Sequence, residues 1–556
     1  MKKLACLFTV LIMTALAACT AAATTTRDAS ALAALGYQYL DPQAPIVAAK
    51  DTVSFRILSS KNALADDYND MAVFQALFDM TNVNVNWENI SESSYTARKN
   101  LIMADKANYP DAIYHAGFSD KEIIQYSTRE VILPIDAYLD YMPNFKAILE
   151  ARPDIRSILT SPDGHIYSLP RVEEMGLLAY PNLLFLNKTW VGELITAGEI
   201  DFLSQGDLVD GLDLTLAEFQ EILTLFKEND MNHNAKADEI PLSFVYQNWQ
   251  GNQSDLFAAF GIPENTDHRT VVDGTVTITA VMDQFFTATN FFAGWVTAGL
   301  IDKEAFSQSQ DAFLAKGKAA QQKLGAFYWW ESETVVTNPQ DYICLDPLIG
   351  PDGHQYVGVS NNPEISKGNF VIFSKCEFPE ILLTYMDRFY DPVISAQINY
   401  GPIGVVYEEE RDEHGMLVQK PIPEGMTADE FRLKNAPLGL IYLSYEQWEN
   451  VINMEPRAKL RLVRLAAHAV PFTYPGATPY PNVSYTLAEI NKLATIEMNL
   501  YDYVYQSLTD WLLNGGVSQA QWSEYKTMLE NIGLTEALDI YQAAYDRYLA
   551  TQATWS

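Results

Sequence analysis

Cysteine is scarce in this chain, which limits the ways in which the fold can be cross-linked. Only four of the 556 residues are cysteine, and two of these, Cys6 and Cys19, lie close to the N-terminus. The remaining pair, Cys344 and Cys376, is too small a set for a disulfide framework, and its spacing matches no metal-binding motif. We expect two buried thiols, with a single bridge as the alternative.

Basic side chains are also few, which narrows the class of partner. The chain has 37 Lys and Arg against 71 Asp and Glu, a formal net charge of −34. Such a surface repels a phosphate backbone, and no basic cluster is dense enough to reverse the field, so we expect no nucleic-acid partner. With 48% hydrophobic and 12% aromatic residues the chain can fill large cores. At about 150 residues per domain, its length predicts roughly two to four domains.

Sequence signatures of catalysis are missing as well. The chain contains no His-Glu-x-x-His metal site, no phosphate-binding Gly-x-x-x-x-Gly-Lys loop, no Gly-x-Gly-x-x-Gly turn and no Gly-x-Ser-x-Gly nucleophile elbow. Asp and Glu are abundant throughout, yet no pair stands out as the two carboxylates of a glycoside hydrolase. These absences argue against four common catalytic sites and leave an acidic pair for glycoside hydrolysis as an open alternative.

The N-terminus carries a targeting signal. Two lysines precede an apolar run from Leu4 to Ala18, which is shorter than the roughly 20 residues of a membrane-spanning helix. We interpret residues 1–18 as a secretory signal peptide. Cys19 then offers a thiol for diacylglycerol attachment, so the segment resembles a bacterial lipobox; an ordinary signal peptide with an incidental cysteine is the alternative. Residues 19–50 are rich in Ala and Thr without apolar periodicity, which predicts a flexible tether.

Strands and helices alternate in the region that follows. Strand-like patterns occur at Thr52–Leu58, Val83–Trp87 and Asp111–Tyr114, and the first two are separated by helical spacing at Met71–Phe78. This rhythm predicts an α/β fold with a parallel sheet. From Thr486 onward the pattern is helical instead, with capping residues and a Gly-Gly stop.

A contiguous loop carries oxygen-bearing side chains at alternate positions. Counted from Asp230 as position 1, the loop lacks the glycine of an EF-hand at position 6 (Ala235) and the glutamate at position 12 (Pro241). The remaining spacing converges oxygens on one point, which predicts a structural Ca²⁺; the alternative is a solvated polar turn. The predicted ligands are Asp230, Asn232, Asn234, the carbonyl of Lys236, Asp238 and Glu239.

Aromatic residues supply the candidate ligand site. Within Phe327–Glu331, strand alternation directs Trp329 and Trp330 to opposite faces. An indole can stack on the apolar face of a sugar while a neighbouring carboxylate bonds its hydroxyl groups, so Trp330 with Glu331 predicts a saccharide platform. The alternative is that both indoles belong to the core. The full candidate set is Trp330, Glu331, Trp329, Trp249, Asn248, Tyr95 and Arg171.

Several segments together resemble the family 1 extracellular solute-binding lipoproteins of bacterial ABC sugar importers. The resemblance covers nearly the whole mature chain and implies a two-lobed periplasmic-binding-protein fold, type II, with a helical C-terminal region. It places residues 51–178 and 357–403 in lobe 1, and 179–356 and 404–556 in lobe 2. In calcium-binding members the oxygens matching those of the Asp230 loop are ligands. The segments are the lipobox, Asp67–Met71, Leu133–Asp136, Pro143–Asn144, Leu186–Trp190, Asp230–Leu242 and Tyr400–Pro402.

These observations predict a monomeric receptor, lipid-anchored on the outer side of the cytoplasmic membrane. It would capture an oligosaccharide and deliver it to an ABC permease. A neutral sugar is preferred over an alginate-like acid because an acidic protein is a poor cage for a polyanion, although local cations such as Arg171 could reverse this. The alternatives are a receptor for peptides or other small solutes and a lipid-anchored glycan-degrading enzyme.

Overall fold

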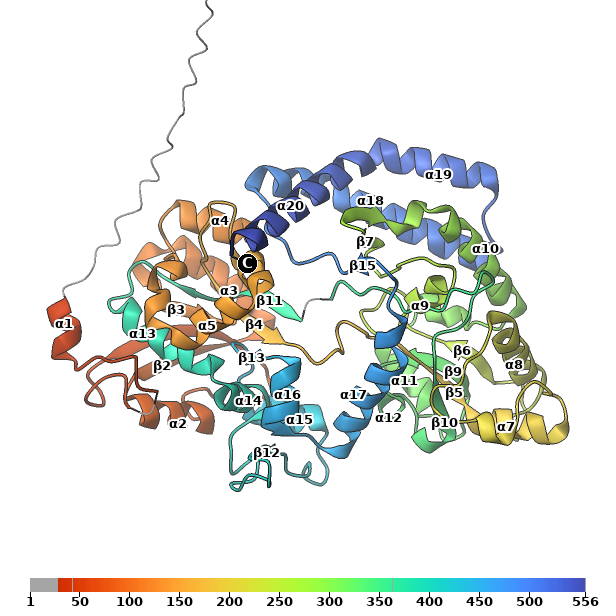
Figure 1. Cartoon of the computed structure of the whole chain (residues 1–556), viewed down its shortest axis with the longest axis horizontal. Coiled ribbons are helices and arrows are strands. Elements are labelled where there is room, and N and C mark those ends of the chain that lie inside the picture. The colour runs from red at the N-terminus through yellow and green to blue at the C-terminus, as the bar shows by residue number, and fades with distance from the viewer. Residues whose placement is uncertain (1–28, 43, 363, 556) are drawn as a thin grey trace, which may run out of the picture.

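The computed structural model describes residues 29–42, 44–362 and 364–555 and places them in two lobes side by side, each built around its own sheet (Figure 1). The first sheet has six strands in the order β13-β4-β11-β3-β1-β2. β11 runs antiparallel to its neighbours β3 and β4, and the other pairs are parallel. The bounds are β1 (Ser54–Lys61), β2 (Asn84–Ser91), β3 (Ala112–Tyr114), β4 (Leu169–Glu173), β11 (Ile365–Ile372) and β13 (Tyr442–Leu443).

Helices cover the first sheet in the rhythm that the sequence predicts. The predicted strands at Thr52–Leu58, Val83–Trp87 and Asp111–Tyr114 correspond to β1, β2 and β3, and the helical spacing at Met71–Phe78 corresponds to α2. The helices of this lobe are α2 (Ala72–Thr81), α3 (Glu92–Ala104), α4 (Asp120–Thr128), α5 (Pro143–Ala151), α6 (Pro153–Leu159), α13 (Pro379–Asp387), α14 (Pro392–Tyr400), α15 (Ala428–Asn435) and α16 (Tyr445–Val451).

The second sheet has four strands in the order β10-β5-β9-β6, with β5 antiparallel to both of its neighbours. Its strands are β5 (Leu183–Asn187), β6 (Ile240–Ser243), β9 (Leu324–Trp329) and β10 (Tyr342–Leu345). Around it lie α7 (Lys188–Ala197), α8 (Leu216–Glu228), α9 (Ser254–Ala258), α10 (Asp283–Ala298), α11 (Gln310–Gly317), α12 (Ser332–Val335) and α17 (Pro456–His468). Two small sheets pair β12 (Leu417–Val418) with β14 (Ile452–Asn453), and β7 (Arg269–Val272) with β8 (Thr275–Ile278) and β15 (Ala477–Thr478).

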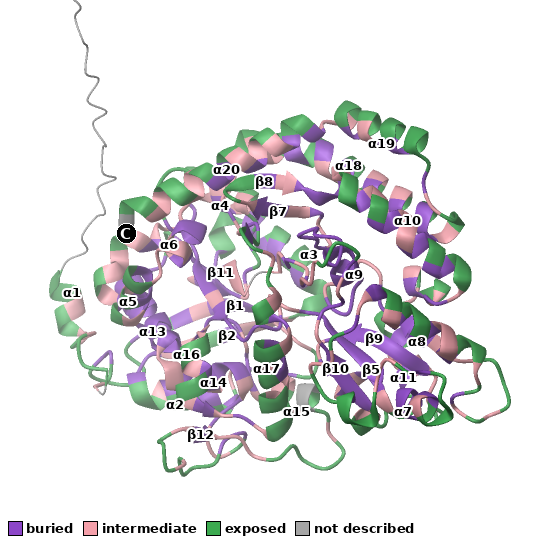
Figure 2. Cartoon of the chain, turned by 45° about the vertical axis from the view of Figure 1, so that its right-hand side comes forward, coloured by how far each residue is buried: buried purple, intermediate pink, exposed green. Residues whose placement is uncertain are grey.

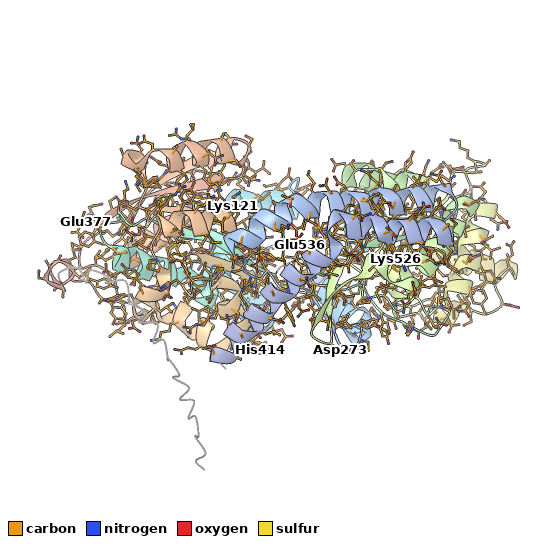
Figure 3. The ribbon with its side chains drawn as sticks, turned by 90° about the horizontal axis from the view of Figure 1, so that it is seen from above. Lys121, Asp273, Glu377, His414, Lys526 and Glu536 are labelled. Carbon is orange, nitrogen blue, oxygen red and sulfur yellow. The ribbon has the colours of Figure 1, made fainter. Side chains whose placement is uncertain are left out.

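The C-terminal region is helical, as predicted, and it reaches across both lobes. α18 (Leu487–Asn514) packs on α10, and its N-terminus carries the capping box of Thr486 and Glu489. α19 (Gln519–Ile532) follows, and α20 (Leu534–Trp555) returns to α6 of the first lobe. Figure 3 shows these helices from above, with Glu536 at the start of α20 and Lys526 on α19.

Buried residues line both sheets and the helix faces next to them, and exposed residues lie on the outer faces of the helices (Figure 2). Cys344 and Cys376 are buried free thiols, so the expectation of two unbridged cysteines is confirmed. No helix within the described part of the chain combines the length and apolar composition that membrane crossing requires.

The chain returns to the second lobe later than the resemblance implies. β13 lies inside the range 404–556 that was expected in lobe 2, yet it pairs with β4 in the first sheet, where Leu443 is fully buried. The chain leaves the first lobe after β14, and α17 then forms ion pairs with second-lobe carboxylates. The segment around β13 remains in the first lobe because its apolar residues complete the core of that lobe. A family pattern in the sequence does not show this packing.

Residues 29–42 and 44–50 do not form the flexible tether that was predicted for residues 19–50. α1 (Ala29–Ala34) is helical, Ile46 and Val47 are fully buried in the first core, and the hydroxyl groups of Tyr37 and Thr384 are 2.7 Å apart. The segments 29–42 and 44–50 therefore pack on the first lobe. The predicted signal peptide and the lipidation site Cys19 lie outside the described residues.

Candidate functional site

The carboxyl ends of the parallel strands in both sheets point towards the space between the lobes. β1, β2, β3 and β4 end at one edge of the first sheet, and the chain passes from the end of β4 directly to β5 of the other lobe. In the second sheet β6, β9 and β10 end at the edge where β5 begins. Ligands of open α/β sheets bind outside such carboxyl ends, so the candidate site lies between these two edges.

A pocket of about 350 Å³ opens at this edge of the first sheet. We call it the first-lobe pocket. Its walls come from the residues that follow β1, β2 and β3 and from the segment that leads to β13. The lining residues are Ser60, Asn62, Ala65, Tyr68, Glu92, Tyr95, Thr96, Lys99, His115, Gly117, Leu433, Ala436, Pro437 and Leu438.

The end of β3 is tied to the segment before β13 through side-chain hydrogen bonds. The Nε2 atom of His115 lies 2.8 Å from the carbonyl oxygen of Pro437, which also accepts a bond of 3.1 Å from the hydroxyl of Tyr68. The Tyr114 hydroxyl donates to the carbonyl of Leu438 and accepts from the Leu440 amide at 3.3 Å. These bonds satisfy carbonyls that would otherwise be buried without partners, and they hold the pocket wall in place.

The charged and phenolic groups of the pocket are already paired. Lys99 Nζ lies 2.9 Å from a carboxylate oxygen of Glu122, and Asn62 donates to Glu92 at 3.1 Å. The Tyr95 hydroxyl donates to the carbonyl of Ala116 at 2.9 Å. Burial lowers the pKa of His115 to about 4, so its ring is neutral at pH 7. The pocket therefore presents no unpaired cation among the described residues that line it.

Two tryptophans lie at the opposing edge of the second sheet. Trp330 directly follows β9, and Trp249 belongs to the loop after β6; their rings meet edge to face with centroids 5.4 Å apart. Both residues are half-buried. The Trp249 carbonyl accepts a bond of 3.2 Å from Asn362, which lies on the crossing between β10 and β11. We call these two residues the tryptophan pair.

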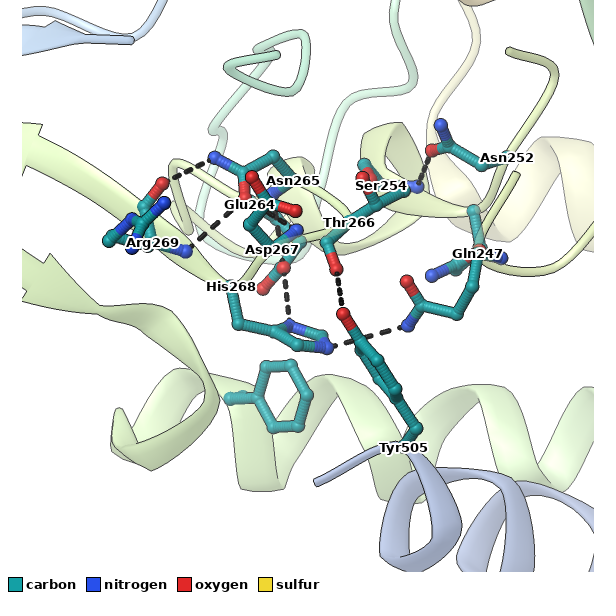
Figure 4. Close-up of polar contacts among 12 residues, drawn as sticks. Gln247, Asn252, Ser254, Glu264, Asn265, Thr266, Asp267, His268, Arg269 and Tyr505 are labelled. Carbon is teal, nitrogen blue, oxygen red and sulfur yellow. Dashed lines mark hydrogen bonds and ion pairs between the residues drawn. The ribbon is translucent and has the colours of Figure 1, made fainter. Parts of the chain in front are cut away.

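A buried polar network supports the loop that carries Trp249 (Figure 4). The Gln247 amide lies 3.4 Å from His268 Nε2 and can only donate to it, so the opposite ring nitrogen carries the proton and donates to Glu264 at 2.7 Å. His268 and Glu264 are both about 1% exposed. Gln247 adopts a left-handed φ of 57°, a conformation that a residue other than glycine holds only when its surroundings impose it.

The Asp230 loop contains two residues with left-handed backbone conformations. His233 and Ala235 adopt left-handed φ angles of 54° and 60°. Asp230 accepts hydrogen bonds from the Asn234 and Ala235 amides at 3.0 and 2.8 Å. Asp238 pairs with Lys323 at 2.8 Å, and Lys323 first, then the two asparagine amides, hold the pKa of Asp238 below its usual range.

Comparison with known proteins identifies the family. No protein-family model matches the chain. The fructooligosaccharide ABC transporter substrate-binding protein FusA of Streptococcus pneumoniae is 32% identical over 515 residues, which cover 90% of this chain and 91% of FusA. The chain belongs to the substrate-binding proteins of ABC transporters. As a member, it is a receptor rather than an enzyme, and its surroundings are extracellular.

Solved structures share the two-lobed fold of this substrate-binding protein. FusA of S. pneumoniae in complex with kestose superposes with a TM-score of 0.75 at 32% identity, over 89% of this chain and 99% of that chain. An extracellular solute-binding protein from Bifidobacterium longum subsp. infantis has a TM-score of 0.74 at 20% identity, over 89% and 98% of the two chains. The predicted family and two-lobed α/β fold are confirmed.

Three of the predicted ligand residues of this substrate-binding protein are committed to contacts within the protein. Trp329 is fully buried with its ring 5.2 Å from that of Phe313, so it is part of the core. Glu331 is buried and paired with Arg457 and with Arg461. Although burial raises the pKa of Glu331, these arginines bring it below its usual value.

Arg171, the third of these residues, belongs to an ion-pair network between β4 and α14. Its guanidinium bonds Glu173 and lies 3.0 Å from the Asn399 side-chain oxygen. Burial alone would raise the pKa of Glu173, but Arg171 and Arg432 lower it to about 2. Arg171 therefore serves the fold rather than offering a free cation to an acidic sugar.

The other predicted residues fall on the two opposing edges. Trp330, Trp249 and Asn248 lie together on the second lobe, and Tyr95 lines the first-lobe pocket. The sequence interpretation missed the residues that follow β1, β2 and β3, such as Asn62, Glu92 and His115. Their signal was available, because polar residues placed directly after successive parallel strands gather at one edge of the sheet.

Proposed function

We propose that this substrate-binding protein captures a neutral oligosaccharide of the fructooligosaccharide class between its lobes for an ABC importer. The observation that carries the proposal is the pairing of a polar pocket on one edge with half-buried tryptophans on the other. A sugar ring has hydroxyl groups at its rim and apolar C–H faces, and this arrangement matches both. The identity with FusA, a fructooligosaccharide-binding receptor, supports the choice of ligand class.

The charges around the site favour a neutral ligand. The protein has a net charge of −34, and Lys99, the basic side chain among the described residues lining the first-lobe pocket, is paired with Glu122. An acidic oligosaccharide would have to leave water without a cation to replace the lost solvation, which is costly. Peptides and acidic glycans are therefore the less favoured ligands.

Ligand binding can be tested by thermal shift and calorimetry with the full chain. We expect kestose and nystose to raise the melting temperature, since a ligand at 100 times its dissociation constant stabilises the folded state by about 2.7 kcal/mol. An alginate trisaccharide serves as the acidic control and should produce no shift. If peptides bind and sugars do not, the ligand is a peptide and the proposed sugar ligand is wrong. If the sugar is recovered cleaved, the protein is an enzyme and the receptor function is wrong.

A structural Ca²⁺ in the Asp230 loop is the second part of the proposal. The side-chain oxygens of Asn232 and Asn234 are buried and have no hydrogen-bond donor, which is costly for an amide oxygen unless a cation or water meets it. Asp230, Lys236, Asp238 and Glu239 complete the candidate set. A solved structure of a FusA EF-hand mutant, 31% identical to this chain, indicates that this relative carries such a motif.

The calcium proposal predicts that chelation lowers the melting temperature and that added Ca²⁺ restores it. Asp230→Ala should remove the response, because this residue supplies the first carboxylate of the loop. Asp201→Ala, on an exposed site outside the loop, is the matched control and should respond like the parent protein. An unchanged melting temperature at every calcium concentration would show that the loop is only a polar turn.

The proposed location is the outer side of the cytoplasmic membrane, with Cys19 carrying the lipid and an ABC permease as partner. The apolar run Leu4–Ala18 and the lipobox-like sequence support it. Cys19→Ser should release the protein into the medium when it is expressed in a bacterium that processes lipoproteins. Retention of that variant in the membrane fraction would exclude the anchor.

A further inference from the structure

His115 adopts a backbone conformation that is unfavourable for a residue other than glycine. It follows the last residue of β3 with a left-handed φ of 53°, and Leu438, across the first-lobe pocket, has a φ of 59°. Residues other than glycine keep such conformations only where surrounding contacts impose them, and these residues concentrate at ligand-binding sites. The two strained residues belong to segments that the Tyr114 hydroxyl ties together.

The hydrogen bond to Pro437 settles which ring nitrogen of His115 carries the proton. A carbonyl oxygen has no proton to give, so His115 Nε2 must be the donor in the 2.8 Å contact. In the neutral ring the other nitrogen, Nδ1, then has a lone pair and can only accept. The ring is held edge-on against Tyr114 with centroids 4.6 Å apart, so Nδ1 has a defined direction.

His115 Nδ1 is left for a ligand. Within the described part of the chain no residue donates a hydrogen bond to it, and it is not among the polar atoms sealed in the interior. The Tyr68 and Tyr95 hydroxyl groups of the same pocket donate to backbone carbonyls, and Asn62 donates to Glu92. These three donors are therefore engaged, while His115 Nδ1 and the Glu92 carboxylate are acceptors in the pocket wall.

We propose that His115 is a specificity-determining residue whose Nδ1 accepts a hydrogen bond from a hydroxyl group of the bound oligosaccharide. This inference rests on the proposed function and deepens it. An acceptor at this point selects a ligand group that donates, and it disfavours a carboxylate, sulfate or deoxy position there. The Pro437 contact acts as the positioning element, because it keeps the proton on Nε2 and leaves the lone pair on Nδ1.

Two substitutions separate the accepting atom from the positioning contact. His115→Asn places a side-chain oxygen close to the position of Nδ1, and asparagine tolerates the left-handed conformation. His115→Gln keeps an amide donor within reach of the Pro437 carbonyl but has no acceptor near Nδ1. A merely structural role for His115 predicts that both variants lose affinity in proportion to their loss of melting temperature.

The experiment is isothermal titration of kestose into the full chain and its variants, with melting temperatures measured alongside. We expect His115→Asn to bind within about threefold of the parent and His115→Gln to bind about tenfold more weakly, the effect of one hydrogen bond to a neutral group. His414→Gln is the control and should bind normally, because the His414 side chain is 73% exposed and does not line the pocket.

Kestose analogues with one hydroxyl replaced by hydrogen sharpen the result. The analogue that lacks the hydroxyl group bound by His115 should bind the parent protein about tenfold more weakly than kestose does. The His115→Gln variant should bind this analogue and kestose equally well, because the variant already lacks the hydrogen bond. Equal losses in both variants, or full affinity in His115→Gln, would overturn the role of Nδ1 while leaving the receptor function intact. If the parent protein binds neither kestose nor nystose, the proposed ligand class and the role of Nδ1 both fail.

Discussion

The two edges that flank the candidate site differ in the chemical groups that they present. The first-lobe pocket is polar, and its side chains are fastened to backbone carbonyls of the segment before β13. The second-lobe edge presents the tryptophan pair, whose apolar ring faces make contacts that do not depend on direction. Under the proposed function, this difference assigns the discrimination of hydroxyl positions to the first lobe and the apolar contact area to the second.

The strongest test of this comparison concerns the neighbouring indoles on β9 and just beyond it. Trp329→Ala should lower the free energy of unfolding by about 4 kcal/mol, because it empties a fully buried site in the core. Denaturant titration measures the change. If the variant instead keeps its stability and loses kestose affinity, Trp329 belongs to the ligand wall and the division drawn here is wrong.

The next largest effect concerns Asp255, which contacts the β4–β5 and β10–β11 connections between the lobes. It accepts hydrogen bonds from the Gly358 amide at 2.9 Å and the Asn182 side chain at 3.4 Å, and burial raises its pKa from 3.8 to about 6. A carboxyl whose pKa is higher in the folded state than in the unfolded state makes folding more favourable as the pH falls through that interval. Stability contributed by this group should therefore rise between about pH 7 and pH 4, by up to about 3 kcal/mol.

Asp255→Asn isolates this contribution, because the amide keeps an oxygen for Gly358 and cannot titrate. The unfolding free energy of the parent relative to the variant should increase as the pH falls from about 7.5 to about 4, because only the parent gains stability by taking up a proton at this site. Asp273→Asn, a change in the loop between β7 and β8 away from the crossings, is the control for general acid effects. A difference that stays constant with pH would show that Asp255 is ionised normally in the folded protein.

The smallest of the three effects is on affinity alone. Trp330→Ala should weaken kestose binding by about 2 kcal/mol, or about 30-fold, through loss of stacking area. Trp330→Phe should retain part of the affinity, and Met498→Ala, on the exposed face of α18, should retain all of it. Unchanged binding in Trp330→Ala would remove the tryptophan pair from the site and leave the first-lobe pocket as the main contact.

Periodicity made much of the fold predictable. The alternation of β1 and β2, the helical spacing of α2 and the capping box of α18 depend on neighbours within a few residues, so they are visible in the sequence. The burial of Ile46 and the pairing of β13 with β4 depend on segments hundreds of residues away or on space left in a core. No local pattern records such contacts, and both were missed.

The candidate site shows the same division. Alternation predicted that Trp329 and Trp330 face opposite ways, although both were in the candidate set, and the structure buries Trp329 and leaves Trp330 half-buried. It could not reveal that Glu331 and Arg171 are held by Arg457 and Asn399, residues that come from distant helices. Local spacing thus indicated candidate residue types for a ligand. Only the tertiary structure decided which of them still have a free hydrogen-bonding atom, because a polar group is available only when no distant partner has already satisfied it.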